Sequence, residues 1–313
     1  MLSFIDALPG AASQGLIWGI MAIGLYITYR LLELSDLTVD GSFCTGGAVC
    51  VMMLLGGQSP LVSMLVALIA GMLTGLVTGF LHTTWKIPAI LAGILTQLGL
   101  WSVNLAIMGQ ANQGLSARNQ KLLVSMLYLK QVEKGTKPFY MHPIFTVAVV
   151  TAVIIILLYW FFGTELGSSI RATGANSNMA RAQGINTDAK KLIGLMLSNG
   201  LVALSGAMLA QYQGFADINM GRGAIVIGLA SVIIGEVIFG KLFKNFGLKL
   251  LSVSLGAVIY YIVIQAVISL MDIDTDYMKL ISASIVAVFL AVPNLRGQMF
   301  GGLLKKKKEA GHA

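Results

Sequence analysis

The chain has 313 residues, of which 57% are hydrophobic and only 11% are charged, and its formal net charge is +8. A soluble domain carries about 25% charged residues, so this composition excludes an ordinary soluble protein and predicts an integral membrane protein. A basic excess in such a chain is typical of cytoplasmic loops and of contact with anionic membrane lipid, and no nucleic-acid partner is expected.

Apolar segments recur along the whole chain. A helical crossing takes about 20 apolar residues, whereas a spanning barrel would need alternating segments of about ten residues, so strands are not expected. We predict an all-α polytopic membrane protein, a single transmembrane domain over residues 1–313 with about nine transmembrane segments. The expected segments are 13–33, 43–57, 60–83, 88–108, 143–162, 192–212, 222–240, 249–271 and 277–294. Segments 43–57 and 222–240 are short or glycine-interrupted, so either could be a broken or re-entrant helix.

The first polar break, residues 35–43, carries two carboxylates, Asp36 and Asp40, close to Ser42. Carboxylates beside a membrane segment are costly unless they are paired, hydrated or at the interface. In one interpretation the break is unwound and lines a wet cavity, where its oxygens bind an ammonium group. In the other it is an interfacial loop in which Asp40 or Ser42 caps a helix.

Three amides, Gln97, Asn104 and Asn199, fall inside expected segments. Such groups face the helix bundle or a solute pathway, so each is a pathway candidate that a helix–helix hydrogen bond would also explain. Glu236 is expected to pair with the nearby Lys241. Cys44 and Cys50 point to different faces of a helix and are expected to be small core residues. The three histidines are far apart in the sequence, and no metal site is expected.

Two long polar connections interrupt the apolar pattern. The loop 109–142 is expected outside the cell, with a helix lying on the membrane surface, and it either receives a solute-binding protein or serves as a spacer. In the connection 163–190, Asn176 is a good N-cap and Gly184 a good C′ residue. The helix between them is too short to be stable alone, so it needs a docking surface. Ala180 and Ala182 keep this helix thin, and Arg181 gives it a charge to pair.

The second connection carries a spaced set of small and polar residues. These are Gly167, Arg171, Ala172, Gly174, Asn176, Ala180 and Gly184, with Arg181 where a second alanine would stand. The pattern resembles the cytoplasmic coupling loop of bacterial ABC importer permeases in the branched-chain amino acid and ribose permease superfamily. That resemblance implies an ABC ATPase subunit whose cleft receives the short helix, with ATP and Mg bound by the ATPase and no cofactor bound by this chain. It also implies a second permease copy, with a homodimer expected, and an extracytoplasmic solute-binding protein.

The run S-D-L-T-V-D-G-S at residues 35–42 resembles a narrower group of permeases associated with tryptophan- and tyrosine-type binding proteins. This second resemblance implies an amino acid as the solute, with an aromatic one favoured.

An internal repeat is also indicated. Residues 16–57 and 192–236 share the order apolar helix, polar break with Asp36 or Asp217, and glycine-rich apolar segment. The two halves would run in opposite directions, as in the inverted repeats of many transporters.

Basic residues predict the orientation, because they concentrate in cytoplasmic loops. If the connection 163–190 is cytoplasmic, 14 of the 21 basic residues are inside. They are Arg30, Lys86, Arg171, Arg181, Lys190, Lys191, Lys241, Lys244, Lys249, Arg296 and Lys305 to Lys308. We therefore expect a multi-pass protein of the bacterial plasma membrane with an external N-terminus and a basic cytoplasmic tail at 296–313.

The sequence has no phosphate-binding loop of the G-x-x-x-x-G-K-[ST] type and no G-x-S-x-G or H-E-x-x-H motif. The chain is therefore expected to be a transport subunit and not an enzyme. The function expected is the permease of an ATP-driven importer. The alternative is a secondary transporter coupled to an ion gradient, which would need a carboxylate deep in the membrane.

Overall fold

The computed structural model describes residues 2–115, 122–133 and 141–271, together with five single positions between 280 and 287. Most of these residues are helical, because a chain in hydrocarbon must satisfy its backbone polar groups within each segment. The helices are α1 (Leu2–Tyr26), continued by the π-helical turn η1 (Ile27–Leu31), α2 (Val39–Leu55), α3 (Pro60–Thr83), α4 (Ala89–Met108), α5 (Met126–Glu133), α6 (Pro143–Gly163), α7 (Glu165–Ala175), α8 (Ser177–Ala182), α9 (Thr187–Gln213), α10 (Ala224–Phe239) and α11 (Phe246–Met271).

Six helical stretches within the described residues are long and apolar enough to cross a membrane, and α2 and α10 are shorter apolar helices. The all-α polytopic fold is thus confirmed, and the two short segments are the ones the sequence marked as short. The expected segment 277–294 and the tail 296–313 lie outside the continuous described ranges.

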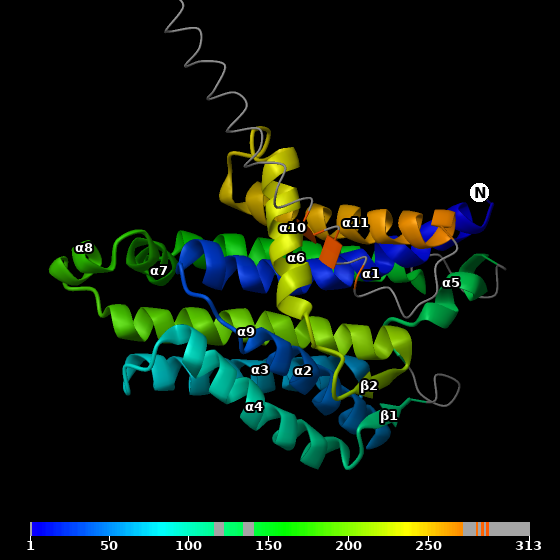
Figure 1. Ribbon diagram of the computed structural model, residues 1–313, viewed down its shortest axis with the longest axis horizontal. Helices are drawn as coiled ribbons and strands as arrows, with labels where there is room; N and C mark the ends of the chain where they lie inside the picture. The colour runs from blue at the N-terminus through cyan, green and yellow to red at the C-terminus, as the bar shows by residue number, and fades with distance from the viewer. Residues whose placement is uncertain are drawn as a thin grey trace, which may run out of the picture.

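The two long connections lie at opposite ends of the bundle. α7 and α8 form one end, and α5 lies at the other end with a small ribbon of strands β1 (Asn112–Gly114) and β2 (Phe215–Asp217) (Figure 1). The ribbon corrects the expectation that the chain has no strands. It forms because α4 and α9 end at left-handed glycines, Gly109 (φ 71°) and Gly214 (φ 81°), and the chains that follow them pair antiparallel.

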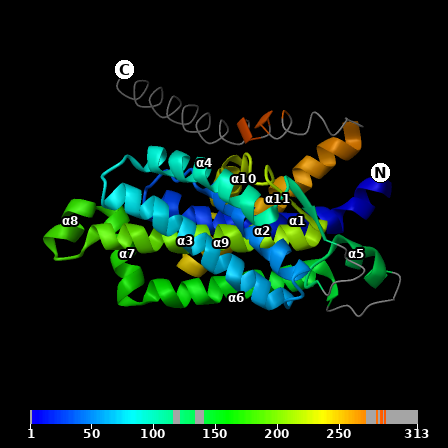
Figure 2. The same ribbon diagram turned by 90° about the horizontal axis from the view of Figure 1, so that it is seen from below.

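Helices α1 and α9 form the buried centre and run side by side (Figures 1 and 2). The Ser198 hydroxyl donates to the Gly24 carbonyl, and the Ser205 hydroxyl donates to the Ile17 carbonyl, both at 2.7 Å. Small residues permit this approach, since a Cβ added to Gly24 would lie 2.8 Å from the Ser198 carbonyl oxygen. Small residues and serines are typical of helix packing in membranes.

These contacts support the predicted inverted repeat. The two polar breaks are 181 residues apart (217 minus 36). Adding 181 to a residue number makes Ser198 equivalent to Ile17 and Ser205 equivalent to Gly24. The Ser198–Gly24 hydrogen bond is therefore the counterpart of the Ser205–Ile17 hydrogen bond in the other half of the repeat. Two antiparallel helices related in this way share a two-fold axis. The shorter helices follow the same rule, because α2 packs on α9 and α10 packs on α1.

The two breaks also have the same local structure. Asp36 Oδ1 accepts a hydrogen bond from the Thr38 amide at 2.9 Å, and Asp217 Oδ1 accepts one from the Asn219 amide at 2.7 Å. Each aspartate thus closes a turn onto the amide two residues later, which aspartate does readily. The turns let the chain leave a long helix and begin a short one.

Candidate functional site

The short helices α2 and α10 begin against each other inside the bundle. The Asp40 carboxylate, in the first turn of α2, accepts hydrogen bonds from the Gly223 amide at 3.0 Å and the Ile225 amide at 3.1 Å. These amides belong to the start of α10, whose cap residue Gly223 has no side chain to bond them. A Cβ on Gly221 would overlap the Asp40 carbonyl oxygen, so glycine is needed at this contact. Asp40 therefore does cap a helix, but it caps α10 and not its own.

A hydrogen-bonded central polar layer lies behind this contact. It consists of Asp36, Thr38, Ser42, Thr74, Thr78, Thr96 and Asn199, all buried. The Asn199 amide nitrogen donates to Asp36 Oδ2 at 2.7 Å, and the Ser42 hydroxyl donates to Asn199 Oδ1 at 2.6 Å. Ser42 also bonds Thr74 at 2.7 Å. Because Asn199 and Thr74 stand near the middle of α9 and α3, the layer lies about halfway along the bundle.

The layer changes the interpretation of the first break. Residues 33–38 are indeed outside any helix, but Asp36 is only 1% exposed and does not line a wet cavity. Its oxygens are occupied by Thr38 and Asn199. Of the two interpretations of the break, the wet cavity does not apply to Asp36, because threonines and an asparagine from α3, α4 and α9 pack around it. Asp36, Ser42 and Asn199 therefore hold the unwound segment in place.

A pocket of about 130 Å³ opens beside Asp40. We call it the α2–α10 pocket; it is lined by Asp40, Gly41, Cys44, Gln97, Leu98, Trp101, Asn104, Ile218 and Arg222. It brings together three of the predicted pathway residues, Asp40, Gln97 and Asn104. Asn104 donates to the Gly41 carbonyl at 3.4 Å, while its buried Oδ1 has no hydrogen-bond partner among the described residues. A buried amide oxygen left unsatisfied is an acceptor available to a ligand.

Two residues of the α2–α10 pocket were missed in the sequence. Trp101 is 46% exposed on α4, and Arg222 is exposed and makes no ion pair with any described residue. Arg222 stands between Gly221 and Gly223, directly before α10. The G-R-G run at the start of a short apolar helix was the available signal, because it places a guanidinium at the second break.

The ion pair expected for Glu236 is also different. Glu236 binds Arg30 of η1 through two contacts, Nε–Oε1 at 2.8 Å and Nη2–Oε2 at 2.5 Å, and not Lys241. Lys241 follows the end of α10 at Gly240, whereas Arg30 lies across the interface between α1 and α10. Cys44 and Cys50 are buried free thiols, as expected.

At the other site, the short helix in residues 163–190 forms as predicted. Asn176 Oδ1 accepts from the Met179 amide at 2.9 Å and begins α8. Gly184 has φ +80°, its amide bonds the Arg181 carbonyl, and the Ile185 amide bonds the Ala180 carbonyl, both at 3.0 Å. This pair of bonds is the Schellman ending that glycine permits at C′.

The preceding helix, α7, packs tightly against the ends of α1 and α6. A Cβ on Gly174 would overlap the Leu31 carbonyl oxygen, and one on Gly167 would overlap Phe162. Ala172, half-buried, accepts the Asn176 amide at 3.1 Å. A displacement of α7 must therefore move the ends of both membrane helices.

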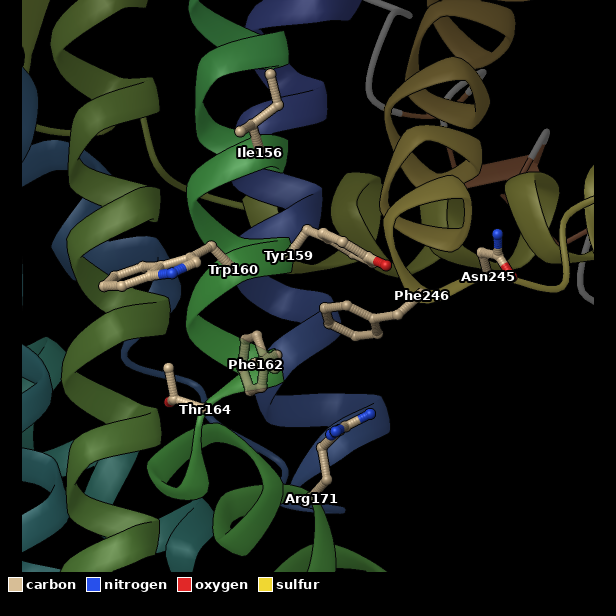
Figure 3. A pocket seen from close by; sticks show the side chains of 9 residues that line it. Ile156, Tyr159, Trp160, Phe162, Thr164, Arg171, Asn245 and Phe246 are labelled. Carbon is tan, nitrogen blue, oxygen red and sulfur yellow. The ribbon is translucent and has the colours of Figure 1, made fainter.

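The structure places three further residues of this loop. Ala180 is fully buried within the chain, whereas Met179 on the outer face of α8 is 51% exposed. Arg181 pairs within the loop, as its charge suggested: it donates to the Thr187 hydroxyl at 2.9 Å and lies 3.9 Å from the Asp188 carboxylate. Arg171 lies 5.8 Å from the centre of the Phe246 ring, at the start of α11 (Figure 3).

Known proteins resemble this chain over most of its length. Residues 8–303 match the family described as "Branched-chain amino acid transport system / permease component". A tyrosine transport system permease protein of Clostridioides difficile is 40% identical over 283 residues, 90% of each chain. An uncharacterized protein of Rickettsia prowazekii is 33% identical, covering 92% of this chain and 98% of its own. An autoinducer 2 import system permease protein of Yersinia pseudotuberculosis is 30% identical, covering 70% and 58%.

No solved structure matches the chain at a significant level. The family match covers well over half of the sequence. The chain belongs to the branched-chain amino acid transport system permease family, and it is a multi-pass membrane transport subunit of the ABC importer type, not an enzyme.

Proposed function

We propose that this chain forms the pathway of an ATP-driven importer for an amino acid, with an aromatic amino acid favoured. The observation that carries the proposal is α8, a short exposed helix whose base, α7, is packed onto the ends of α1 and α6 through Gly174 and Gly167. A separate ATPase chain, which binds ATP and Mg, would dock on the outer face of α8. Its closure would shift α7 and hence the membrane helices.

The α2–α10 pocket offers the chemistry of a zwitterionic aromatic solute. Arg222 can bind a carboxylate, Asn104 Oδ1 can accept from an ammonium group, the negative charge of Asp40 attracts that group, and Trp101 offers a ring face. Arginine binds carboxylates in a two-pronged geometry, and aromatic pairs add stabilisation beyond area burial. The similarity to a tyrosine transport permease supports the same solute class.

The size of the α2–α10 pocket supports a dimer. Ligand sites typically measure about 300–1,000 Å³, so a pocket of about 130 Å³ is a partial site. A second copy facing the exposed side of α4 would enlarge it. The end that carries α5 and the β1–β2 ribbon would then receive an extracytoplasmic binding protein, with α8 and the C-terminus on the cytoplasmic side of the bacterial plasma membrane.

Uptake into proteoliposomes tests the solute and the energy source together. With the ATPase and the binding protein present, radiolabelled tyrosine should accumulate only when ATP is enclosed. Arg222→Gln and Trp101→Ala should lower uptake about fivefold or more, since each removes an interaction of about 1 kcal/mol or more at the site. Lys241→Gln, an exposed cation that lines neither pocket, should leave uptake unchanged.

The secondary-transporter alternative has one observation in its favour, the carboxylate of Asp36 at the middle level of the bundle. Its two oxygens are occupied by neighbours, and Asp36 does not line the α2–α10 pocket. Uptake driven by a proton or sodium gradient without ATP would favour this alternative and contradict the proposal.

A further inference from the structure

A second cavity lies at the end of the bundle where α6, α7 and α11 meet. This α6–α7 cavity measures about 650 Å³. It is lined by Ile156, Tyr159, Trp160, Phe162, Gly163, Thr164, Arg171, Asn245 and Phe246 (Figure 3). It shares no lining residue with the α2–α10 pocket, so neither the solute nor its pathway explains it.

The wall of the α6–α7 cavity is the exposed side of a membrane helix. One stripe of α6 is buried, formed by Pro143, Val147, Thr151, Ile154, Leu158 and Phe162. The opposite side is apolar and exposed, and Trp160 and Tyr159 in the last turns of the helix are 71% and 58% exposed. Tryptophan and tyrosine at the end of a membrane helix mark the level of the lipid headgroups.

The rim of the same cavity carries an available positive charge. Arg171 makes no ion pair with any described residue; its guanidinium lies 5.8 Å from the centre of the Phe246 ring. Tyr159 points toward Phe246 from the other side, and Asn245 lies beyond that ring (Figure 3). Two further exposed cations, Lys244 and Lys249, stand next to Asn245 and one turn along α11. No carboxylate lines the cavity.

We infer that the α6–α7 cavity binds an anionic phospholipid. Arg171 holds the phosphate, and an acyl chain lies along Ile156 and Tyr159 on α6. An arginine can give a phosphate two parallel hydrogen bonds, and an apolar wall ending in aromatic residues matches the boundary between acyl chains and headgroups. The bound lipid then joins α7, the base of the coupling helix, to α6 and α11.

The inference concerns a site apart from the proposed solute pathway and does not depend on the solute. The test uses the full chain purified in detergent, with thermal unfolding and native mass spectrometry as readouts. Dioleoylphosphatidylglycerol should raise the apparent melting temperature and remain bound at low stoichiometry, whereas dioleoylphosphatidylcholine should do so at least tenfold less well. Arg171→Gln should weaken phosphatidylglycerol binding about tenfold, as expected for the loss of one charged hydrogen-bonding group. Arg171→Lys should fall between the two.

Lys190→Gln is the matched control, because it removes one positive charge at the same end of the bundle from a residue outside the cavity. It should bind phosphatidylglycerol as the wild type does. Equal binding of both lipids, or unchanged binding in Arg171→Gln, would overturn the inference. So would glycerol phosphate binding as tightly as the whole lipid, because the apolar wall would then contribute nothing. If Arg171→Gln keeps its lipid but loses the ATPase, the cavity receives protein and the lipid assignment is wrong.

Discussion

At the level of single residues, two glycines allow backbone segments from different parts of the chain to come into direct contact. Gly174 in α7 meets the carbonyl oxygen of Leu31, and Gly221 before α10 meets the carbonyl oxygen of Asp40. At both places even a methyl group would collide with backbone, which cannot move aside as a flexible side chain can. The first contact fixes the coupling loop to α1, and the second fixes the two short helices to each other.

Gly174→Ala should therefore lower stability by about 1–3 kcal/mol, the usual cost of overpacking a tight contact. Gly99→Ala in α4 is the control, since nothing lies within 4 Å of the added Cβ, and replacing a helical glycine by alanine stabilises by about 0.5–1 kcal/mol. Thermal unfolding of both variants in the same detergent checks this. Equal melting temperatures would mean that α7 is free to move away from Leu31.

At the level of elements, the short helix α10 is held at both ends by charged side chains from elsewhere in the chain. Asp40 bonds the amides at the start of α10, and Arg30 of η1 holds its far end through Glu236. The side chains of Arg30 and Glu236 are 52% and 29% exposed, so solvent screens their attraction. The pair sets the position of α10 relative to α1 more than it stabilises the fold.

Reversal of this pair separates its attraction from the roles of the two side chains. Arg30→Glu or Glu236→Arg alone should destabilise by about 1 kcal/mol, because each places two like charges together at a partly exposed site. The double variant should recover most of the loss. Unfolding in a denaturant series measures all four proteins. If the double variant is as unstable as the sum of the singles, the two residues do not act as a pair.

In the molecule as a whole, the antiparallel long helices α1 and α9 form a central frame. The two halves of the internal repeat, each with a polar break and a short helix, are arranged around this frame about a two-fold axis. The α2–α10 pocket lies where the halves meet, and α8 lies at one end of the frame, joined to it through α7. Movement at α8 thus reaches the end of α1, which packs along α9, α10 and α11. This continuous packing is the route by which the proposed docking of an ATPase would act on the proposed solute pathway.

Sequence patterns predicted this fold well wherever the signal is local. The segment expected at 60–83 is α3 (Pro60–Thr83), because Ser59 and Pro60 mark its start, and the caps at Asn176 and Gly184 act as expected. The start of α2 was expected at residue 43 and lies at Val39. The sequence did not indicate this start because a charged residue, Asp40, stands in the first turn. Its carboxylate accepts hydrogen bonds from amides at the start of α10, far along the chain.

The partners of charged residues could not be predicted for the same reason. Glu236 was assigned to Lys241, its neighbour in sequence, while its true partner Arg30 is 206 positions away. The face on which Ala180 lies could not be predicted either, because a small side chain fits both an external groove and an internal contact. Such assignments depend on which helices meet, and a single sequence does not carry that information.

Cysteine cross-linking tests most directly whether an ATPase subunit docks on α8. Met179→Cys on the outer face of α8 should cross-link to a single ATPase subunit, and Met179→Glu should abolish co-purification. The matched control is Met126, also a highly exposed methionine at 58%, but on α5 at the opposite end. Met126→Cys should give no ATPase cross-link, and Met126→Glu should co-purify normally. Cross-linking through Met126 and not Met179, or undiminished binding in Met179→Glu, would contradict the account.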